Sequence, residues 1–254
     1  MSDANGKKIR LKIRRQDGPD QPSYWQTFEL PYEPQLNVIT CLQRIAELGR
    51  TADGQKTTPV AWDSNCLEEV CGACTMVINR RVRQACSALV DRLLAEADEI
   101  RLEPMSKFPV VRDLVVDRSR MFEALKRIKA WVPVDGYYDL PTPRLTQNEQ
   151  EELYPLSRCM TCGCCLEACP QVNPKTNFIG AHAISLAVLF NSHPTGAAEK
   201  QARLYALMEK GGLMECGNAQ NCVKVCPKEI PLTDSIAKAG RALTFASIKH
   251  WLDR

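Results

Sequence analysis

The sequence lacks the features that mark membrane-spanning, secreted or nucleic-acid-binding proteins. Its longest apolar stretch, Ala183 to Phe190, includes Ser185 and is far shorter than the roughly 20 residues of a membrane helix. No apolar segment follows the charged N-terminus, so we expect no secretory signal. The 33 basic and 30 acidic residues leave a net charge of +3, which is too small to indicate a nucleic-acid partner.

Groups for nucleotide binding or acid–base chemistry are also scarce. No glycine pattern of the Rossmann or P-loop kind occurs. The three histidines, His182, His193 and His250, are scattered, and no nucleophile–base pair stands near any motif. We therefore expect no substrate chemistry in this chain alone.

Cysteine, in contrast, is abundant. The count of 13 is odd, which excludes a framework of fully paired disulfides. A chain of 254 residues can bury a core without disulfides. Clustered cysteines in a chain that keeps its thiols reduced usually bind metal or do redox work. The sequence thus predicts a soluble, intracellular protein that uses its cysteines for chemistry.

The N-terminal part, residues 1–105, has the patterns of a small α/β domain. Alternation and turn residues predict strands over 8–14, 25–30, 75–78, 82–84 and 100–102. A helix is predicted between an Asn37 cap and Gly49. Its predicted apolar face consists of Cys41, Leu42, Ile45 and Leu48.

The remainder, residues 106–254, is predicted to be helical. Helix-like patterns run over 111–131, 178–191, 197–210 and 232–252, and a proline-rich loop or linker is expected at 134–143. With the domain boundary placed near residue 105, the predicted fold class is α+β.

The first cysteine motif has the spacing of a plant-type [2Fe–2S] site, C-x4-C-x2-C followed by a distant cysteine. Its members are Cys66, Cys71, Cys74 and Cys86. Between the second and third, Gly72 and Ala73 leave backbone amides free to face sulfur. Structural zinc, the alternative, usually uses two C-x2-C pairs, and only one is present here. The segment resembles a plant-type ferredoxin domain of the β-grasp kind, and this resemblance supplies the fold name.

A second motif occurs twice in the C-terminal half. Cys159, Cys162, Cys165 and Cys169 form the bacterial ferredoxin run C-x2-C-x2-C-x3-C-P. The run recurs with Cys216, Cys222 and Cys226, but Ala219 stands where its second cysteine would be.

In two-cluster ferredoxins the fourth cysteine of each run binds the other run's cluster. This rule gives one site with Cys159, Cys162, Cys165 and Cys226, predicted to hold [4Fe–4S]. The other site has only Cys169, Cys216 and Cys222, and the simplest occupant is [3Fe–4S]. A [4Fe–4S] cluster with one open iron is the alternative there. Two cysteines remain: Cys41, expected in the core, and Cys164, expected to pack beside a cluster.

Together, these motifs resemble the iron–sulfur subunit of succinate dehydrogenase and fumarate reductase. A plant-type [2Fe–2S] domain precedes a complete run and a run that lacks its second cysteine, and the segment Phe108 to Arg118 is similar to that family's linker. The bacterial-ferredoxin-like second domain would be all-α. The stretch Cys216 to Cys222 looks like the version in Gram-positive bacteria, whose complexes use menaquinone and a dihaem cytochrome b anchor.

The resemblance implies a relay from an FAD-containing flavoprotein through [2Fe–2S], [4Fe–4S] and [3Fe–4S] to a quinone. Cys66, Cys71, Cys74 and Cys86 would face the flavoprotein, and the [3Fe–4S] ligands would face the membrane anchor, with Pro170 beside the quinone pocket. The chain would lie peripherally on the cytoplasmic face of the cell membrane, with no transmembrane segment of its own.

One departure concerns the quinone. Ubiquinone-using members commonly have a tryptophan soon after Cys-Pro and a histidine after the first cysteine of the second run. This chain has Val172-Asn173-Pro174 and Gly217 instead, which favours a different quinone or a differently built site.

Three functions are compatible with the motifs. The first is the electron-transfer subunit of a succinate:quinone oxidoreductase, working either in succinate oxidation or as a fumarate reductase. The second is a free ferredoxin-like shuttle, and the third is the iron–sulfur subunit of another flavoprotein oxidoreductase.

Overall fold

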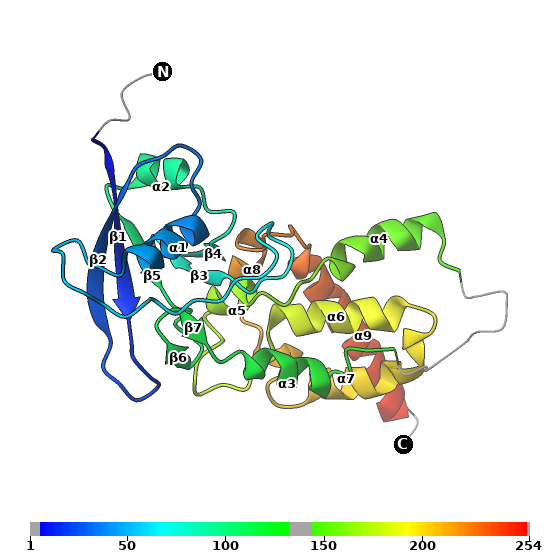
Figure 1. Ribbon diagram of the computed structural model, residues 1–254. Coiled ribbons are helices and arrows are strands. Elements are labelled where there is room, and N and C mark those ends of the chain that lie inside the picture. The colour runs from blue at the N-terminus through cyan, green and yellow to red at the C-terminus, as the bar shows by residue number, and fades with distance from the viewer. Residues whose placement is uncertain (1–5, 133–143, 253–254) are drawn as a thin grey trace. The chain divides into compact units, whose positions relative to one another are not determined.

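The computed structural model of the chain describes residues 6–132 and 144–252. It divides into two compact units, Met1–Asp117 and Arg118–Arg254 (Figure 1). The loop predicted at 134–143 lies outside the described residues.

The first unit is built on a five-stranded sheet of order β2-β1-β5-β3-β4. Its strands are β1 (Lys8–Arg15), β2 (Tyr24–Pro31), β3 (Thr75–Ile78), β4 (Arg81–Gln84) and β5 (Ile100–Glu103). β1 and β5 pair in parallel, and the other neighbours are antiparallel. All five predicted strands are therefore confirmed to within a residue or two. The alternation of β1 places Ile9, Leu11 and Ile13 fully in the core.

Helix α1 (Val38–Leu48) begins and ends as its sequence predicts. Asn37 Oδ1 accepts a hydrogen bond from the Thr40 amide at 2.9 Å, and Gly49 closes the helix in the left-handed region at φ 58°. The prediction that Leu48 lies on the buried face is wrong. That side chain is 53% exposed, because Leu48 is the last residue of α1, directly before the Gly49 cap, where the chain turns away from the helix. A short helix that was not predicted, α2 (Val90–Glu96), buries Val90 and Leu93.

The helix predicted over 111–131 is also wrong in its first part. Residues 110–116 form a small hairpin of β6 (Val110–Arg112) and β7 (Val115–Val116), and helix α3 (Ser119–Arg127) begins only afterwards. At the hairpin turn Asp113 has φ 47°, and its carboxylate accepts hydrogen bonds from Arg15 Nε at 2.8 Å and from the amides of Gln16 and Ala61. These bonds tie the hairpin to the first unit, so the division falls after Asp117 rather than near residue 105.

The second unit is a bundle around α6 (Gly180–Ser192), which contacts five other helices. They are α3, α4 (Gln147–Ser157), α5 (Cys164–Glu167), α7 (Lys200–Met208) and α9 (Leu232–Leu252). Residues 180–188 of α6 are all buried, as an apolar helix at the centre of a bundle requires. Helix α8 (Asn221–Lys224) and the 3₁₀ turns Gly196–Glu199 and Leu213–Glu215 complete the unit.

Three helix predictions in this unit agree with the structure, with small changes at the ends. The segment predicted over 197–210 starts as a 3₁₀ turn before α7. Helix α4 was not predicted, although Thr146 and Glu149 form a capping box at its start.

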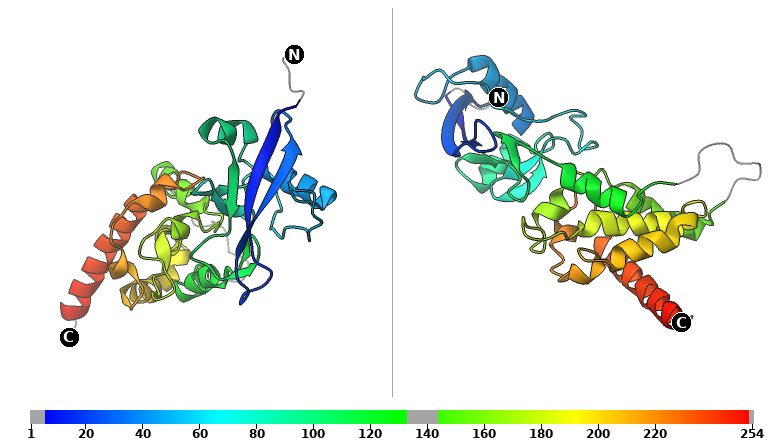
Figure 2. Two further views of the ribbon diagram at one scale, coloured as in Figure 1. Left: turned by 90° about the vertical axis from the view of Figure 1, so that its left-hand side faces the viewer. Right: turned by 90° about the horizontal axis from the view of Figure 1, so that it is seen from below.

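The C-terminal part of α9 extends beyond the other helices of its unit (Figure 2). Phe245, Ile248 and Leu252 are exposed there, at spacings that put them near one face of the helix. Among the described residues, no helix is long and apolar enough to span a membrane.

Candidate iron–sulfur sites

The loop from Cys66 to Cys74 curls so that its amides point at sulfur. Cys66 Sγ accepts hydrogen bonds from the amides of Val70 at 3.2 Å and Cys71 at 3.3 Å, and Cys71 Sγ accepts one from the Ala73 amide at 3.4 Å. Backbone amides, that of Glu68 first, lower the pKa of the Cys66 thiol to about 7. The loop therefore stabilises a thiolate, which is the form that binds iron.

The other two cysteines of this motif come from the β3–β4 hairpin. Cys74 directly precedes β3 and Cys86 follows β4, and the Ala85 amide donates to the Cys74 carbonyl at 3.1 Å. Both side chains are buried. Burial raises the pKa of Cys86 to about 12, with further contributions from the neighbouring Cys74 and Cys66. The hairpin thus brings the distant fourth cysteine back to the loop, as the spacing predicts.

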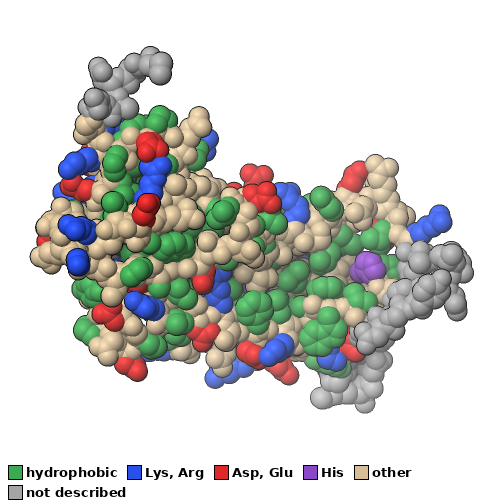
Figure 3. All heavy atoms as spheres, in the orientation of Figure 1, with side chains coloured by type: hydrophobic (Ala, Val, Ile, Leu, Met, Phe, Trp, Pro, Cys, Tyr) green, Lys and Arg blue, Asp and Glu red, His purple; other side chains and the backbone are tan. Residues whose placement is uncertain are grey.

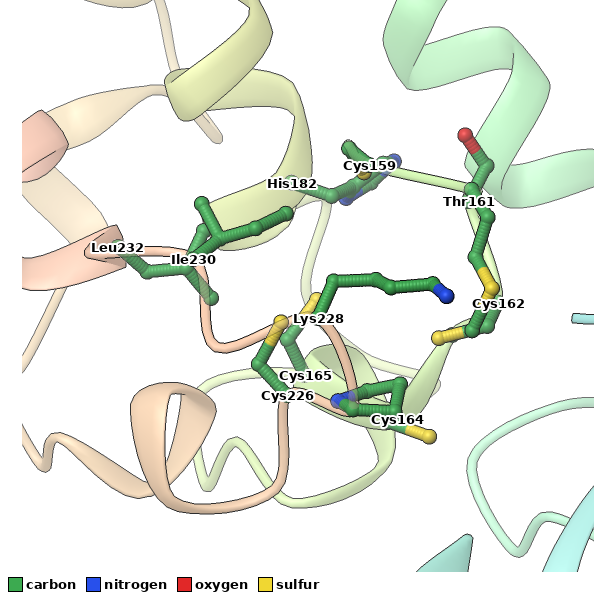
Figure 4. A pocket seen from close by; sticks show the side chains of 13 residues that line it. Cys159, Thr161, Cys162, Cys164, Cys165, His182, Cys226, Lys228, Ile230 and Leu232 are labelled. Atoms are coloured by element: carbon green, nitrogen blue, oxygen red, sulfur yellow. The ribbon is translucent and has the colours of Figure 1, made fainter. Parts of the chain in front are cut away.

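In the second unit, cysteines from both runs surround one cavity (Figure 4). Cys159, Cys162, Cys165 and Cys226 all line it. Burial raises the pKa of the Cys165 thiol well above its ordinary value, and the charges of Cys162, Cys159 and Cys226 add to this shift. The pKa of Cys162 is lowered to about 7, first by a hydrogen bond from the Cys164 thiol.

A second cavity is lined by the remaining three run cysteines, Cys169, Cys216 and Cys222, together with Pro170 and Ala219. Burial raises the pKa of Cys222, and the charges of Cys169 and Cys216 raise it further, as expected for thiols that face one another. Both groups predicted from the exchange of the fourth cysteine are thus brought together in space. The methyl group of Ala219 offers no metal ligand.

The two runs also repeat in backbone conformation. Thr161 and Asn218, at equivalent positions, have φ near +50°, and Gly163 and Gln220 precede their short helices in the left-handed region. Asn221 Nδ2 donates to the Ala168 carbonyl at 3.1 Å and joins one short helix to the other. The repeated spacing is therefore a repeated structure.

The arrangement fits clusters better than single ions. Within the described residues, no three His, Cys, Asp or Glu side chains converge closely enough to hold one metal ion. A zinc ion needs four ligands at about 2.0–2.3 Å from one point. An iron–sulfur cluster extends over several atoms, so its thiolates stand further apart around a cavity such as the two described here.

The two spare cysteines lie where they were expected. Cys41 is fully buried in the core of the first unit, and burial raises its pKa to about 11. Cys164 is fully buried and lines the first cavity. Two further residues of that cavity, His182 and Lys228, were not predicted as site residues. The sequence feature that could have identified His182 is the presence of a ring with polar nitrogens inside the apolar stretch 178–190.

Comparisons with known proteins agree with this geometry. A family model described as a 2Fe-2S iron-sulfur cluster binding domain matches residues 10–123, and one described as a 4Fe-4S dicluster domain matches residues 155–230. The second model ends past Cys226 and so spans both runs.

Two curated relatives match nearly the whole chain. The succinate dehydrogenase iron-sulfur subunit of Bacillus subtilis is 56% identical over 246 residues, which cover 96% of each chain. The fumarate reductase iron-sulfur subunit of Haemophilus influenzae is 29% identical over 247 residues, 92% of each. Among solved structures, a chain of the Mycobacterium smegmatis Sdh1 complex in its apo form has the same fold. Its TM-score is 0.76 at 23% identity, over 94% of this chain and 96% of that one. On the identity with the Bacillus relative, this chain belongs to the family of succinate dehydrogenase iron–sulfur subunits.

Proposed function

We propose that this chain is the electron-transfer subunit of a membrane-bound succinate:quinone oxidoreductase. The observation that carries the proposal is the division of eleven cysteines into three groups. Four lie in the first unit, four line one cavity of the second unit, and three line the other. When bound, iron–sulfur clusters accept and release single electrons, which lets a two-electron flavin communicate with a quinone.

Each cysteine has a proposed role. Cys66, Cys71, Cys74 and Cys86 hold [2Fe–2S], with the loop amides stabilising the thiolates. Cys159, Cys162, Cys165 and Cys226 hold [4Fe–4S]. Cys169, Cys216 and Cys222 hold [3Fe–4S], since Ala219 leaves one corner without a ligand. Pro170 lines the same cavity, and we propose that it lies beside the quinone pocket.

The partners are proposed from the family. A flavoprotein carrying FAD supplies electrons, and a membrane anchor of the dihaem cytochrome b type receives them with menaquinone. Two exposed regions suit such contacts: Leu67 and Val70 in the [2Fe–2S] loop, and the apolar face of α9 at Phe245 and Ile248. The chain would then lie peripherally on the cytoplasmic face of the cell membrane. On the face drawn in Figure 3, acidic and basic side chains are interspersed and form no large patch of one charge. The docking surfaces are therefore proposed from exposed apolar residues and not from charge.

The direction proposed is succinate oxidation with reduction of a quinone. Fumarate reduction is the second candidate, because fumarate reductase subunits are also among the relatives. The two are separated by comparing succinate-driven quinone reduction with quinol-driven fumarate reduction in the purified complex. A free shuttle is excluded if the chain co-purifies with a flavin-containing partner.

Low-temperature electron paramagnetic resonance tests the cluster assignment. The oxidised complex should show a three-iron signal that disappears on reduction, and the reduced complex should show the other two clusters. In Ala219→Cys we expect the three-iron signal to be replaced by a second four-iron signal of lower potential. Ala219→Val is the matched control, because it adds similar bulk without a thiol and should keep the three-iron signal. Four irons at this site in the wild-type protein would contradict the assignment.

A further inference from the structure

Helix α6 buries one imidazole in an otherwise apolar environment. His182, in its first turn, is 2% exposed. The other buried polar side chain of α6, Ser185, lies 3.3 Å from the Ser235 hydroxyl on α9 and so has a partner. Burying a polar group without a hydrogen bond is costly, so buried ring nitrogens normally have partners.

Within the described residues the ring of His182 does not satisfy this rule. Its Nε2 lies 3.4 Å from the Met121 carbonyl oxygen, beyond the usual 2.7–3.2 Å of an N–H···O bond. Its Nδ1 is buried and has no hydrogen-bond partner there. One side of the ring is therefore weakly bonded, and the other is unbonded.

The ring of His182 lies beside the first cavity, and the described residues supply no hydrogen-bond partner for its Nδ1. His182 lines the same cavity as Cys159, Cys162, Cys165 and Cys226 (Figure 4). The group proposed to fill that cavity offers sulfides and thiolate sulfurs, which accept hydrogen bonds and donate none. A ring N–H can donate a hydrogen bond to such a sulfur. A ring lone pair in its place would be repelled by the negative charge of the sulfur.

We propose that His182 donates its Nδ1–H to a sulfur of the [4Fe–4S] cluster and raises the reduction potential of that cluster. The inference rests on the proposed ligand assignment for the first cavity. Reduction adds one negative charge to the cluster, so a donor to sulfur stabilises the reduced form more than the oxidised form. Hydrogen bonds to the sulfurs are among the factors that set cluster potentials.

A neutral imidazole carries a single N–H, so only one of the two ring nitrogens of His182 can donate. The hydrogen bond from Nε2–H to the Met121 carbonyl is long, so the competing tautomer, with the proton on Nδ1, gives up only a weak bond.

Redox titration of the purified complex, followed by electron paramagnetic resonance, tests the sign of the effect. We expect His182→Leu to lower the midpoint potential of the [4Fe–4S] cluster while leaving the other two clusters unchanged. His182→Gln, which keeps an N–H donor, should retain part of the wild-type value. His193→Leu is the control, because His193 bonds to Thr195 and does not line this cavity. An unchanged or raised [4Fe–4S] potential in His182→Leu would overturn the proposal.

A second measurement keeps the test decisive if His182→Leu fails to retain its cluster. In the wild-type complex labelled with ¹⁵N-histidine, the reduced [4Fe–4S] signal should carry a nitrogen coupling and an exchangeable-proton coupling. Absence of both couplings on an intact four-iron signal would overturn the role of His182 alone. Absence of the four-iron signal itself would instead refute the proposed ligand assignment.

Discussion

Burial raises the pKa of the Cys41 thiol to about 11, whereas backbone amides lower the pKa of Cys66 to about 7. The two residues differ only in their surroundings: a dry core against the sheet in one case, a curled loop with inward amides in the other. Because the thiolate is both the metal ligand and the nucleophile, surroundings alone separate a structural cysteine from a ligand.

This difference predicts how the spare cysteine reacts. At pH 8 a thiol with a pKa of about 11 is ionised in roughly one molecule per thousand, so native Cys41 should resist alkylation by iodoacetamide. Raising the pH towards 11 increases the thiolate fraction, but complete burial still limits access. Mass spectrometry should find Cys41 modified only in denaturant. Rapid labelling of Cys41 in the folded holoprotein at pH 8 would contradict its assignment to the core.

The candidate ligands could be proposed from the sequence because cysteine spacing reflects the geometry of a loop directly. The exchange of Cys169 and Cys226 between the runs was predicted from the rule for two-cluster ferredoxins, and the structure brings both predicted groups together around two cavities. His182 was not predictable in this way. Its place beside the first cavity depends on how α6 packs, which no local pattern encodes.

At the scale of elements, the two cysteine runs are one local structure built twice with different residues. Before the short helix the first run has Gly163 at φ 91°, and the second has Gln220 at φ 57°. A residue with a Cβ in this region carries about 1–2 kcal/mol of strain, which glycine avoids. At this position the second run therefore holds strain that the first does not.

Substitutions at Gly163 and Gln220 should have opposite effects on the stability of the second unit. Gly163→Ala is expected to destabilise the second unit by about 1–2 kcal/mol and to speed loss of the four-iron signal on heating. Gln220→Gly should be neutral or stabilising by up to about 1 kcal/mol, since relieved strain is partly offset by the greater freedom of unfolded glycine. Thermal unfolding followed by cluster absorbance measures both. A stabilising Gly163→Ala would show that the left-handed turn is not required.

The hairpin at residues 110–116 shows why one element was mispredicted. Val111, Val115 and Val116 suit either helical or strand patterns, so periodicity could not decide between them. The hairpin is stabilised by Asp113, which is fully buried and bonded to Arg15, a residue 98 positions earlier in the chain. A contact so distant in sequence is invisible to local patterns.

The same pair predicts a large effect on stability. Arg15→Met removes the buried cation of Asp113 and leaves only the partly exposed Arg112, 3.9 Å from the carboxylate, which should destabilise the first unit by about 3–5 kcal/mol. Lys8→Met removes the exposed pair with Glu29 and should cost less than about 1 kcal/mol. Denaturant unfolding monitored by the [2Fe–2S] absorbance compares them. Equal losses of unfolding free energy in the two variants would mean that the buried pair contributes no more to stability than the exposed pair.

At the scale of the whole molecule, composition and cysteine order predicted the fold class and the succession of the two domains. They also predicted most elements of the first unit, since its strands alternate and its helix has clear caps. The exposed surfaces of the first unit were harder to predict, because exposure depends on the packing of distant segments. Leu67 and Val70 are half-exposed apolar residues in the middle of the cysteine loop, where solvent-facing side chains would ordinarily be polar.

These two residues lead to a prediction about assembly. If the [2Fe–2S] loop docks on the flavoprotein, Leu67 and Val70 become buried, and each half-exposed side chain contributes roughly half of the ~1.5–3 kcal/mol of full burial. Leu67→Asp or Val70→Asp should therefore weaken the subunit contact roughly tenfold or more. The measurement is the flavin content of complex captured through a tag on this chain, at low protein concentration.

Leu48→Asp provides the matched control for this experiment. Leu48 is 53% exposed, close to the 51% of Leu67 and the 54% of Val70, but it lies at the end of α1 outside the cysteine loop. Its replacement should leave the captured flavin unchanged. If Leu48→Asp loses flavin as strongly as Leu67→Asp while both retain the [2Fe–2S] signal, docking does not depend on the cysteine loop. Loss confined to the loop variants would place the flavoprotein contact directly over Cys66 and Cys71. Electrons would then enter the chain through the ligands whose thiolates the loop amides stabilise.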